Sequence, residues 1–174
     1  MGKVMVLLGS ASDRSKMEPA ISKLAGKVDV EVHVVSAHRT PEKFRDIVIN
    51  SDADIFIAGA GMAAALPGSI AALTVKPVIG VPLSGSILNG IDALLATVQM
   101  PKGVPVATVA IDGAENAAIL ALEILGLNNE RAMDAVYKER EEMRVYAEKT
   151  DREFVDNIRA KIKSLLDQQA IEDH

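Results

Sequence analysis

The chain has 174 residues, a formal net charge of −5 and no cysteine. An acidic chain is poorly suited to nucleic acid or to an anionic membrane surface, so we expect neither partner. The lack of cysteine excludes disulfides, thiolate catalysis and cysteine metal sites. Since an apolar strand follows Met1 almost directly, we expect no signal peptide and a cytoplasmic protein.

Charged residues are distributed unevenly along the chain. Residues 126–174 contain 21 charged residues among 49, whereas residues 55–75 contain none. The uncharged segment has the length of a membrane span, but Gly59, Gly61 and Pro67 interrupt it. Burial on both faces of a parallel sheet explains it better. The alanine-rich helices exceed what one small core needs, so we expect an oligomer.

Short apolar runs alternate with segments of helical periodicity. Strands are expected at Val4–Leu8, Val30–Val35, Ile55–Ala58, Val78–Val81 and Val106–Ala110. Helices are expected at Ser15–Ala25, Pro41–Ile49, Ala64–Leu73, Ile91–Val98 and Ala114–Leu125. This alternation predicts an α/β fold with a doubly wound parallel sheet between layers of helices.

The C-terminal region has a different character from the rest of the chain. From about residue 129 the sequence predicts one long or broken helix. Its large apolar residues Phe154, Ile158, Ile162 and Leu165 fall on one face at helical spacing. We therefore divide the chain into an α/β catalytic domain at 1–126 and a helical extension at 127–174. We expect the extension to pack on the same or a neighbouring subunit.

The second expected strand leads into a loop that combines proton chemistry with anion binding. Its residues are Ser36-Ala37-His38-Arg39-Thr40-Pro41. Ligands of open parallel sheets bind at the carboxyl ends of the strands. A histidine there can transfer protons near neutral pH, and Arg39 offers a cationic fork that suits phosphate. Thr40 and Pro41 are typical of a helix N-cap and first helical residue. The alternative is a surface loop with incidental charges.

The first expected strand ends in Gly9-Ser10-Ala11-Ser12-Asp13. A Gly-Ser turn before a helix presents backbone N–H groups to an anion, and Ser10 and Ser12 add hydroxyl groups. The Asp13 carboxylate could accept hydrogen bonds from ribose hydroxyls. The pattern matches neither the dinucleotide fingerprint nor the lysine-bearing P-loop. The alternative is an ordinary helix N-cap at Ser12 or Asp13.

The third expected strand leads into a loop of small residues. It reads Gly59-Ala60-Gly61-Met62-Ala63-Ala64-Ala65-Leu66-Pro67-Gly68. Glycine lets the backbone approach a ligand closely, so this loop could form one wall of a pocket. Tight packing of a helix on the sheet is the alternative. Three such loops at three strand ends favour a binding site.

Four motifs, in this order along the chain, resemble the PurE family. They are Gly-Ser-x-Ser-Asp, Ser-Ala-His-Arg-Thr-Pro, Gly-Ala-Gly-x-Ala-Ala-x-Leu-Pro-Gly and the run from Gln99 to Val106. The resemblance covers roughly residues 3–126. Common bacterial members are N5-carboxyaminoimidazole ribonucleotide mutases of purine biosynthesis. The resemblance implies a flavodoxin-like three-layer sandwich that forms a homo-octamer with active sites near the subunit boundaries.

The resemblance also implies a substrate and the roles of individual residues. The substrate would be a small ribonucleotide, an aminoimidazole with a carbamate on its exocyclic amine. Its carboxyl group would move to ring carbon 4 without ATP, biotin or metal, so that no cofactor is expected. His38 would transfer protons. The substrate-binding residues would be Ser10, Ser12, Asp13, Ser36, Ala37, Arg39, Gly61, Met62, Ala65 and Leu66.

One loop departs from the familiar bacterial pattern Gly-Gly-Ala-Ala-His-Leu-Pro-Gly. Met62 replaces the second glycine and Ala65 replaces the histidine. If that histidine orients the carboxylate in relatives, Ala65 cannot do so. Two alternatives to the mutase therefore stay open. One is direct carboxylation of aminoimidazole ribonucleotide by free carbon dioxide, and the other is a non-catalytic nucleotide-binding module.

Overall fold

The structure is a computed structural model that describes residues 2–172, with side chains described through Leu165 and at Gln168. Contacts between residues divide the chain into two units, Met1–Ala135 and Val136–His174.

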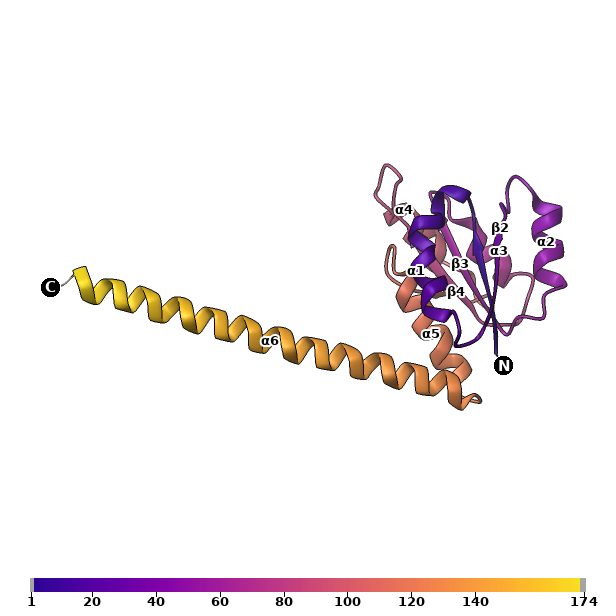
Figure 1. The fold of residues 1–174 in the computed structure, drawn as a ribbon. Coiled ribbons are helices and arrows are strands. Elements are labelled where there is room, and N and C mark those ends of the chain that lie inside the picture. Colours follow the sequence, from indigo (N-terminus) through magenta and orange to yellow (C-terminus); the bar gives the residue numbers. More distant parts are fainter. Residues whose placement is uncertain (1, 173–174) are drawn as a thin grey trace. The chain divides into compact units, whose positions relative to one another are not determined.

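The first unit is built on a sheet of five parallel strands in the order β2-β1-β3-β4-β5 (Figure 1). The strands are β1 (Lys3–Leu8), β2 (Asp29–Val34), β3 (Ile55–Gly61), β4 (Val78–Leu83) and β5 (Ala107–Thr108). The chain leaves β1 for β2 on one side and then returns to β3 on the other side. Connections therefore diverge between β1 and β3, and this is the point where open α/β sheets bind ligands.

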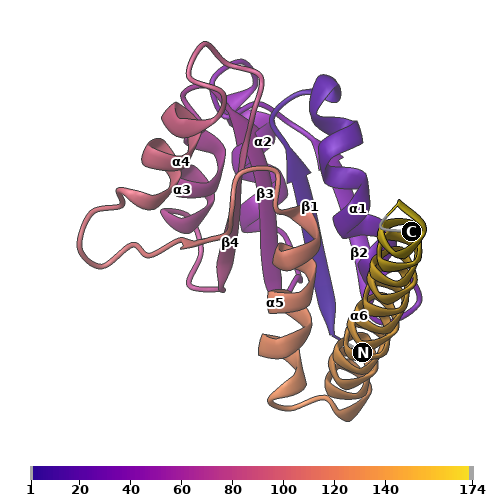
Figure 2. The same cartoon turned by 90° about the vertical axis from the view of Figure 1, so that its left-hand side faces the viewer.

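Helices cover both faces of the sheet (Figure 2). On one face, α1 (Arg14–Leu24), which follows the short turn η1 (Ala11–Asp13), packs against α5 (Ala114–Gly126). The other face carries α2 (Pro41–Ile49), α3 (Ala65–Ala71) and α4 (Ile91–Val98). The predicted α/β fold with a doubly wound parallel sheet is thus confirmed.

The central strands are buried on both faces. Every residue of β4, and every residue of β3 except Gly61, is buried. Burial of β3 accounts for the first part of the uncharged segment, residues 55–61, and no helix among the described residues is long and apolar enough to span a membrane. Packing is close enough to require glycine at position 80, where a Cβ atom would lie 2.4 Å from Cγ2 of the fully buried Thr97.

The observed boundaries differ from the predicted ones mainly at strand ends. β3 and β4 run two to three residues further toward their carboxyl ends than expected, to Gly61 and Leu83. The fifth strand, expected over Val106–Ala110, forms a ladder at only two residues. It lies at the sheet edge and pairs with β4 alone.

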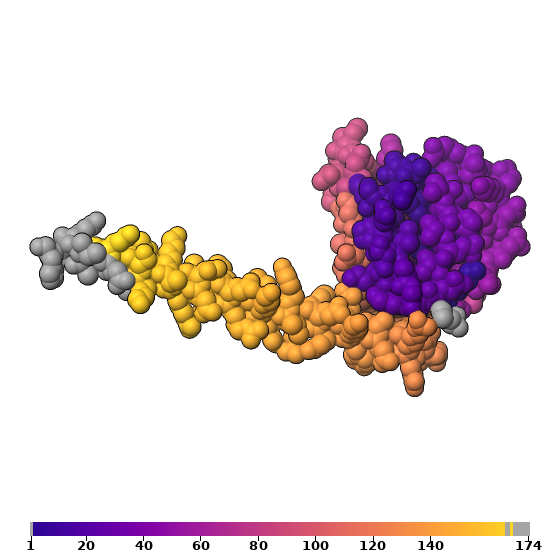
Figure 3. All heavy atoms as spheres, in the orientation of Figure 1, coloured from indigo at the N-terminus to yellow at the C-terminus, as the bar shows by residue number. Residues whose placement is uncertain are grey.

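Helix α6 (Glu130–Glu172) is one unbroken helix of 43 residues, so the expected C-terminal helix is long and not broken. Asn129 starts it, since its Oδ1 accepts a hydrogen bond from the Ala132 N–H at 3.3 Å. Figure 3 shows the side chains of its later part, in yellow, projecting around a single helix. α5 ends at Gly126, the predicted boundary of the α/β domain. What the extension packs on stays a prediction.

Candidate active site

A cavity of about 720 Å³ lies at the carboxyl ends of β1, β2, β3 and β4. Its size is within the usual range for small-molecule sites. It occupies the place where the strand connections diverge. All predicted site residues line it, namely Ser10, Ser12, Asp13, Ser36, Ala37, His38, Arg39, Gly61, Met62, Ala65 and Leu66. The structure therefore brings the three predicted loops together around one space.

The β1 loop presents hydroxyl groups and one carboxylate to the cavity. Ser10 caps the η1 turn, because its Oγ accepts hydrogen bonds from the Ser12 N–H at 3.3 Å and the Ser12 hydroxyl at 2.9 Å. Burial raises the pKa of the Asp13 carboxyl. Hydrogen bonds from the Ser10 backbone and Ser12, with the cations of Lys16 and Arg39, offset part of this effect. Asp13 thus stands ready to accept hydrogen bonds from a ligand.

The β2 loop is tied down around His38. The Arg39 guanidinium donates to the Gly9 carbonyl at 3.1 Å, which links this loop to the end of β1. Thr40 stands at the N-cap of α2 as predicted, but its hydroxyl bonds to the Ser36 backbone instead of capping the helix. Among the described residues, none makes a hydrogen bond to the exposed His38 ring. The imidazole is therefore available to a ligand.

The β3 loop holds backbone conformations that L residues rarely adopt. Met62 has φ +53° and Ala64 has φ +39°, both in the left-handed region. Such strain costs about 1–3 kcal/mol per residue and gathers at functional sites. A Cβ atom at Gly61 would lie 3.3 Å from the Leu83 carbonyl oxygen, so a side chain there would crowd the end of β4. Met62 thus adopts with strain a conformation that glycine adopts freely, which fits the glycine of the bacterial pattern.

The structure adds a fourth loop to the site. Ser84, Gly85 and Ser86 follow β4 and line the cavity together with Lys16 of α1. The Ser-Gly-Ser run directly follows the fourth expected strand, just as the first three loops directly follow theirs. Its place in the site could therefore have been predicted from the sequence. Lys16 carried no such signal, because it lies inside a helix and only the complete fold brings its ammonium within hydrogen-bond distance of Ser84.

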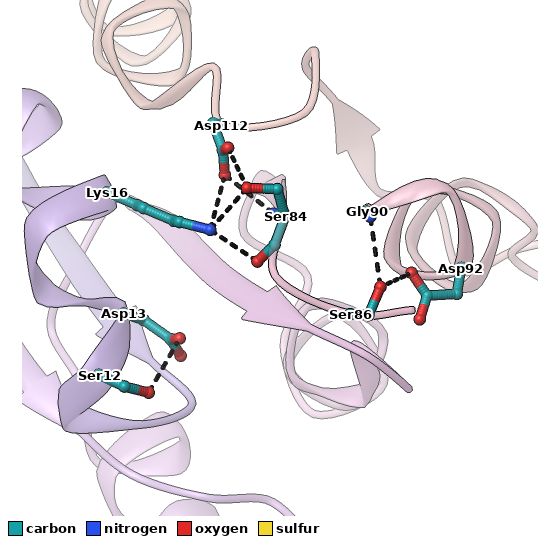
Figure 4. Close-up of polar contacts among 8 residues, drawn as sticks. All are labelled: Ser12, Asp13, Lys16, Ser84, Ser86, Gly90, Asp92 and Asp112. Atoms are coloured by element: carbon teal, nitrogen blue, oxygen red, sulfur yellow. Dashed lines mark hydrogen bonds and ion pairs between the residues drawn. The ribbon is translucent and has the colours of Figure 1, made fainter. Parts of the chain in front are cut away.

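Lys16 is the centre of a polar cluster with Ser84 and Asp112 (Figure 4). Its ammonium donates to the Ser84 carbonyl and hydroxyl, each at 2.6 Å, and lies 3.7 Å from the Asp112 carboxylate. The Ser84 hydroxyl donates in turn to Asp112, which also accepts the Ser84 N–H at 2.9 Å. The cluster therefore ties the segments after β4 and β5 to α1 and gives that wall of the cavity a defined shape.

Asp112 makes a testable contribution to stability. Partial burial opposes its ionisation, but the hydrogen bonds from Ser84 and the Lys16 ammonium outweigh burial and lower the pKa of Asp112. Stability from a lowered carboxyl pKa is present above the pKa of the unfolded chain, about 3.9, and is lost as the pH falls through the folded value. We expect Asp112→Asn to lower the free energy of unfolding at pH 7 and to have a smaller effect near pH 3, below the unfolded pKa.

Urea unfolding at both pH values measures this difference. Asp46→Asn, at an exposed carboxylate of α2 outside the cavity lining, is the matched control. An equal deficit of Asp112→Asn at the two pH values would contradict the ionic role.

The AIR carboxylase family model matches residues 3–145 of the chain. This chain belongs to the AIR carboxylase family. An N5-carboxyaminoimidazole ribonucleotide mutase from Methanocaldococcus jannaschii is 54% identical over 147 residues, covering 83% of this chain and 93% of the relative. A phosphoribosylaminoimidazole carboxylase from Candida glabrata is 51% identical over 130 residues, covering 72% of this chain and 23% of that protein.

A solved structure supports the family assignment at the level of the fold. The crystal structure of Treponema denticola PurE superposes with a TM-score of 0.75 at 26% identity, covering 87% of this chain and 98% of that one. The predicted resemblance to the PurE family and the flavodoxin-like fold are therefore confirmed. The family model ends at residue 145, so the later part of α6 lies beyond it.

Proposed function

We propose that this chain is an N5-carboxyaminoimidazole ribonucleotide mutase of purine biosynthesis. It moves a carboxyl group from the exocyclic amine to ring carbon 4 of aminoimidazole ribonucleotide. One observation carries the proposal. In a chain that is 54% identical to a named mutase, the cavity at the divergence of β1 and β3 gathers His38, Arg39 and the Gly-Ser loop. The mutase prediction is supported over its alternatives by these relatives.

The exposed imidazole of His38 performs both proton transfers. It first donates a proton to the amine nitrogen as the carbamate N–C bond breaks, which releases carbon dioxide and a nucleophilic aminoimidazole. Ring carbon 4 then attacks carbon dioxide and forms the new C–C bond. The imidazole of His38 then removes the proton from ring carbon 4. This step restores the aromaticity of the substrate ring and returns His38 to its starting protonation state. Such acid–base catalysis contributes about 10²–10⁴-fold.

The other cavity residues hold the substrate around this histidine. The Arg39 guanidinium and the hydroxyls of Ser10 and Ser12 bind the phosphate, and Asp13 accepts hydrogen bonds from the ribose. The loop around Gly61, which lacks polar side chains, retains carbon dioxide in a dry space. Ser36, Ala37, Met62, Ala65 and Leu66 complete the proposed substrate contacts.

The enzyme acts as a homo-octamer in the cytoplasm. Exposed apolar residues at helical spacing on α4, namely Ile91, Leu95 and Val98, are 48–52% exposed in the single chain and support an interface there. Burying them against a neighbour removes this apolar surface from water. The mass of the protein in solution, measured by light scattering, tests the octamer.

Two assays with purified protein test the reaction. The first supplies the carbamate substrate at low bicarbonate, and the second supplies the unmodified ribonucleotide with abundant bicarbonate. Rapid conversion of the carbamate substrate is the expected result. Conversion of the unmodified ribonucleotide alone would make the enzyme a carboxylase. Binding without any conversion would make it a nucleotide-binding module.

Direct carboxylation is the second candidate function, because Ala65 leaves the loop without the histidine of the bacterial pattern. The Candida glabrata relative bears the carboxylase name at 51% identity. Ala65→His separates the two functions. If the missing histidine mattered for the carbamate substrate, this variant would raise its turnover relative to the bicarbonate-dependent reaction.

A further inference from the structure

The second unit carries an apolar stripe on an otherwise charged helix. Successive residues of an α-helix rotate by about 100° around its axis, so Phe154, Ile158 and Leu165 lie within about 40° of one another, with Ile162 at the edge. Their exposed fractions are 65%, 40%, 51% and 52% in that order. These side chains form a continuous line on one face of α6, which is typical of a helix that packs on another element.

The stripe runs almost parallel to the helix axis. Met143, Phe154 and Leu165 are spaced by eleven residues, and so are Ala147 and Ile158. A period of eleven residues gives about 3.67 residues per turn, close to the α-helical value, so the apolar line hardly drifts around the helix. It offers a straight contact surface to a second helix.

Most of this surface lies beyond the part of the chain that the family model matches. The family model ends at residue 145, and Phe154, Ile158, Ile162 and Leu165 all lie beyond it. The proposed enzyme chemistry gives them no role. The charges of the neighbouring residues on the helix therefore have to indicate which element these apolar side chains pack against.

The charges along the helix select the partner and its direction. Residues 146–156 hold four acidic and two basic side chains, whereas residues 157–165 hold three basic and no acidic ones. Parallel pairing of two copies would place each segment beside its own like charges. Antiparallel pairing places the acidic segment of each copy beside the basic segment of the other, which is electrostatically favourable.

We propose that residues 147–165 of α6 pair antiparallel with the same segment of a second copy of this chain. The two-fold axis passes near position 156. Each residue therefore lies opposite a residue of the partner that is equally far from position 156 on the other side of it. Phe154 then packs against the partner's Ile158. The small Ala147 faces the partner's Leu165, and Thr150 faces the partner's Ile162. On either side of the central Phe154–Ile158 contact, large side chains therefore meet small ones, which allows close helix packing.

An ion pair adjoins this apolar contact. By the same rotation of about 100° per residue, Asp151 and Lys161 lie about 60° and about 20° from Phe154, on opposite sides of it, so both adjoin the stripe. Positions 151 and 161 are equally far from position 156, so Asp151 lies opposite the partner's Lys161, and the two-fold axis repeats this pair.

Disulfide cross-linking tests the direction of pairing, because the chain has no cysteine of its own. Full-length Ala147→Cys and Leu165→Cys chains are expressed separately and then together with different tags. Antiparallel pairing predicts a disulfide-linked heterodimer from the mixture and little product from either variant alone. Equivalent positions would lie about 27 Å apart along the helices. Cross-linking of each variant with itself would show parallel pairing, and no product from the mixture would show no pairing. Either result overturns the proposal.

Charge exchange in the same two cysteine chains tests the register. We expect Lys161→Glu to lower the heterodimer yield several-fold at low salt, and the added change Asp151→Lys to restore it. Arg152→Glu, on the opposite face of the helix, is the control that leaves the yield unchanged. Circular dichroism verifies that each variant keeps its helix. An unchanged yield in Lys161→Glu, or no recovery in the double variant, would contradict this register.

Discussion

The variant His38→Asn is expected to lose about 10²–10⁴-fold in kcat on the carbamate substrate while KM and substrate affinity change little. Asparagine keeps a polar side chain of similar reach but cannot carry a proton near neutral pH. The His38 ring has no hydrogen-bond partner among the residues that the structure describes, so its loss should leave the loop intact. Steady-state kinetics measures kcat and KM, and calorimetry measures the affinity for the substrate.

His33→Asn is the matched control for this experiment. His33 lies in β2, where its Nε2 is 2.8 Å from Glu31, and it does not line the cavity. Turnover should therefore stay near that of the wild type. A His38→Asn enzyme with wild-type kcat would remove His38 from the mechanism, and an equal loss in both variants would point to a structural effect.

Replacing Arg39 by methionine is expected to raise KM by about 10–100-fold with a smaller change in kcat. Hydrogen bonds between a guanidinium and a phosphate contribute about 1.5–3 kcal/mol, and each 1.4 kcal/mol corresponds to a factor of ten. Methionine keeps much of the apolar stem but removes the charge and the contact with the Gly9 carbonyl. Initial rates over a range of substrate concentrations separate the two constants.

Two further variants sharpen the test of Arg39. Arg14→Met removes an exposed guanidinium of α1 that is paired only loosely, 3.8 Å from Glu18, and should leave KM unchanged. Arg39→Lys keeps the charge without the planar fork, so only partial recovery is expected. A fall in kcat at constant KM in Arg39→Met would instead place this side chain beside the reacting carbon.

Most of the site was predictable because its residues are contiguous in sequence and follow apolar strands. His38 and Arg39 come directly after one strand, and Ser10 to Asp13 come directly after another, so the rule that parallel sheets bind ligands at strand ends applies to both. The Ser84–Ser86 loop obeys the same rule. Lys16 does not, because it lies inside a helix and reaches the cavity only through the complete fold.

Local sequence determined the elements of this protein and the chemistry that they carry. Apolar runs and helical periodicity are properties of neighbouring residues, so they predict strands and helices before any packing is known. The order β2-β1-β3-β4-β5 is a property of the whole chain, and it decided which strand ends meet. The Lys16–Ser84–Asp112 cluster likewise arose only when segments distant in sequence were packed together. Contacts between distant segments depend on the complete fold, which short-range patterns do not encode.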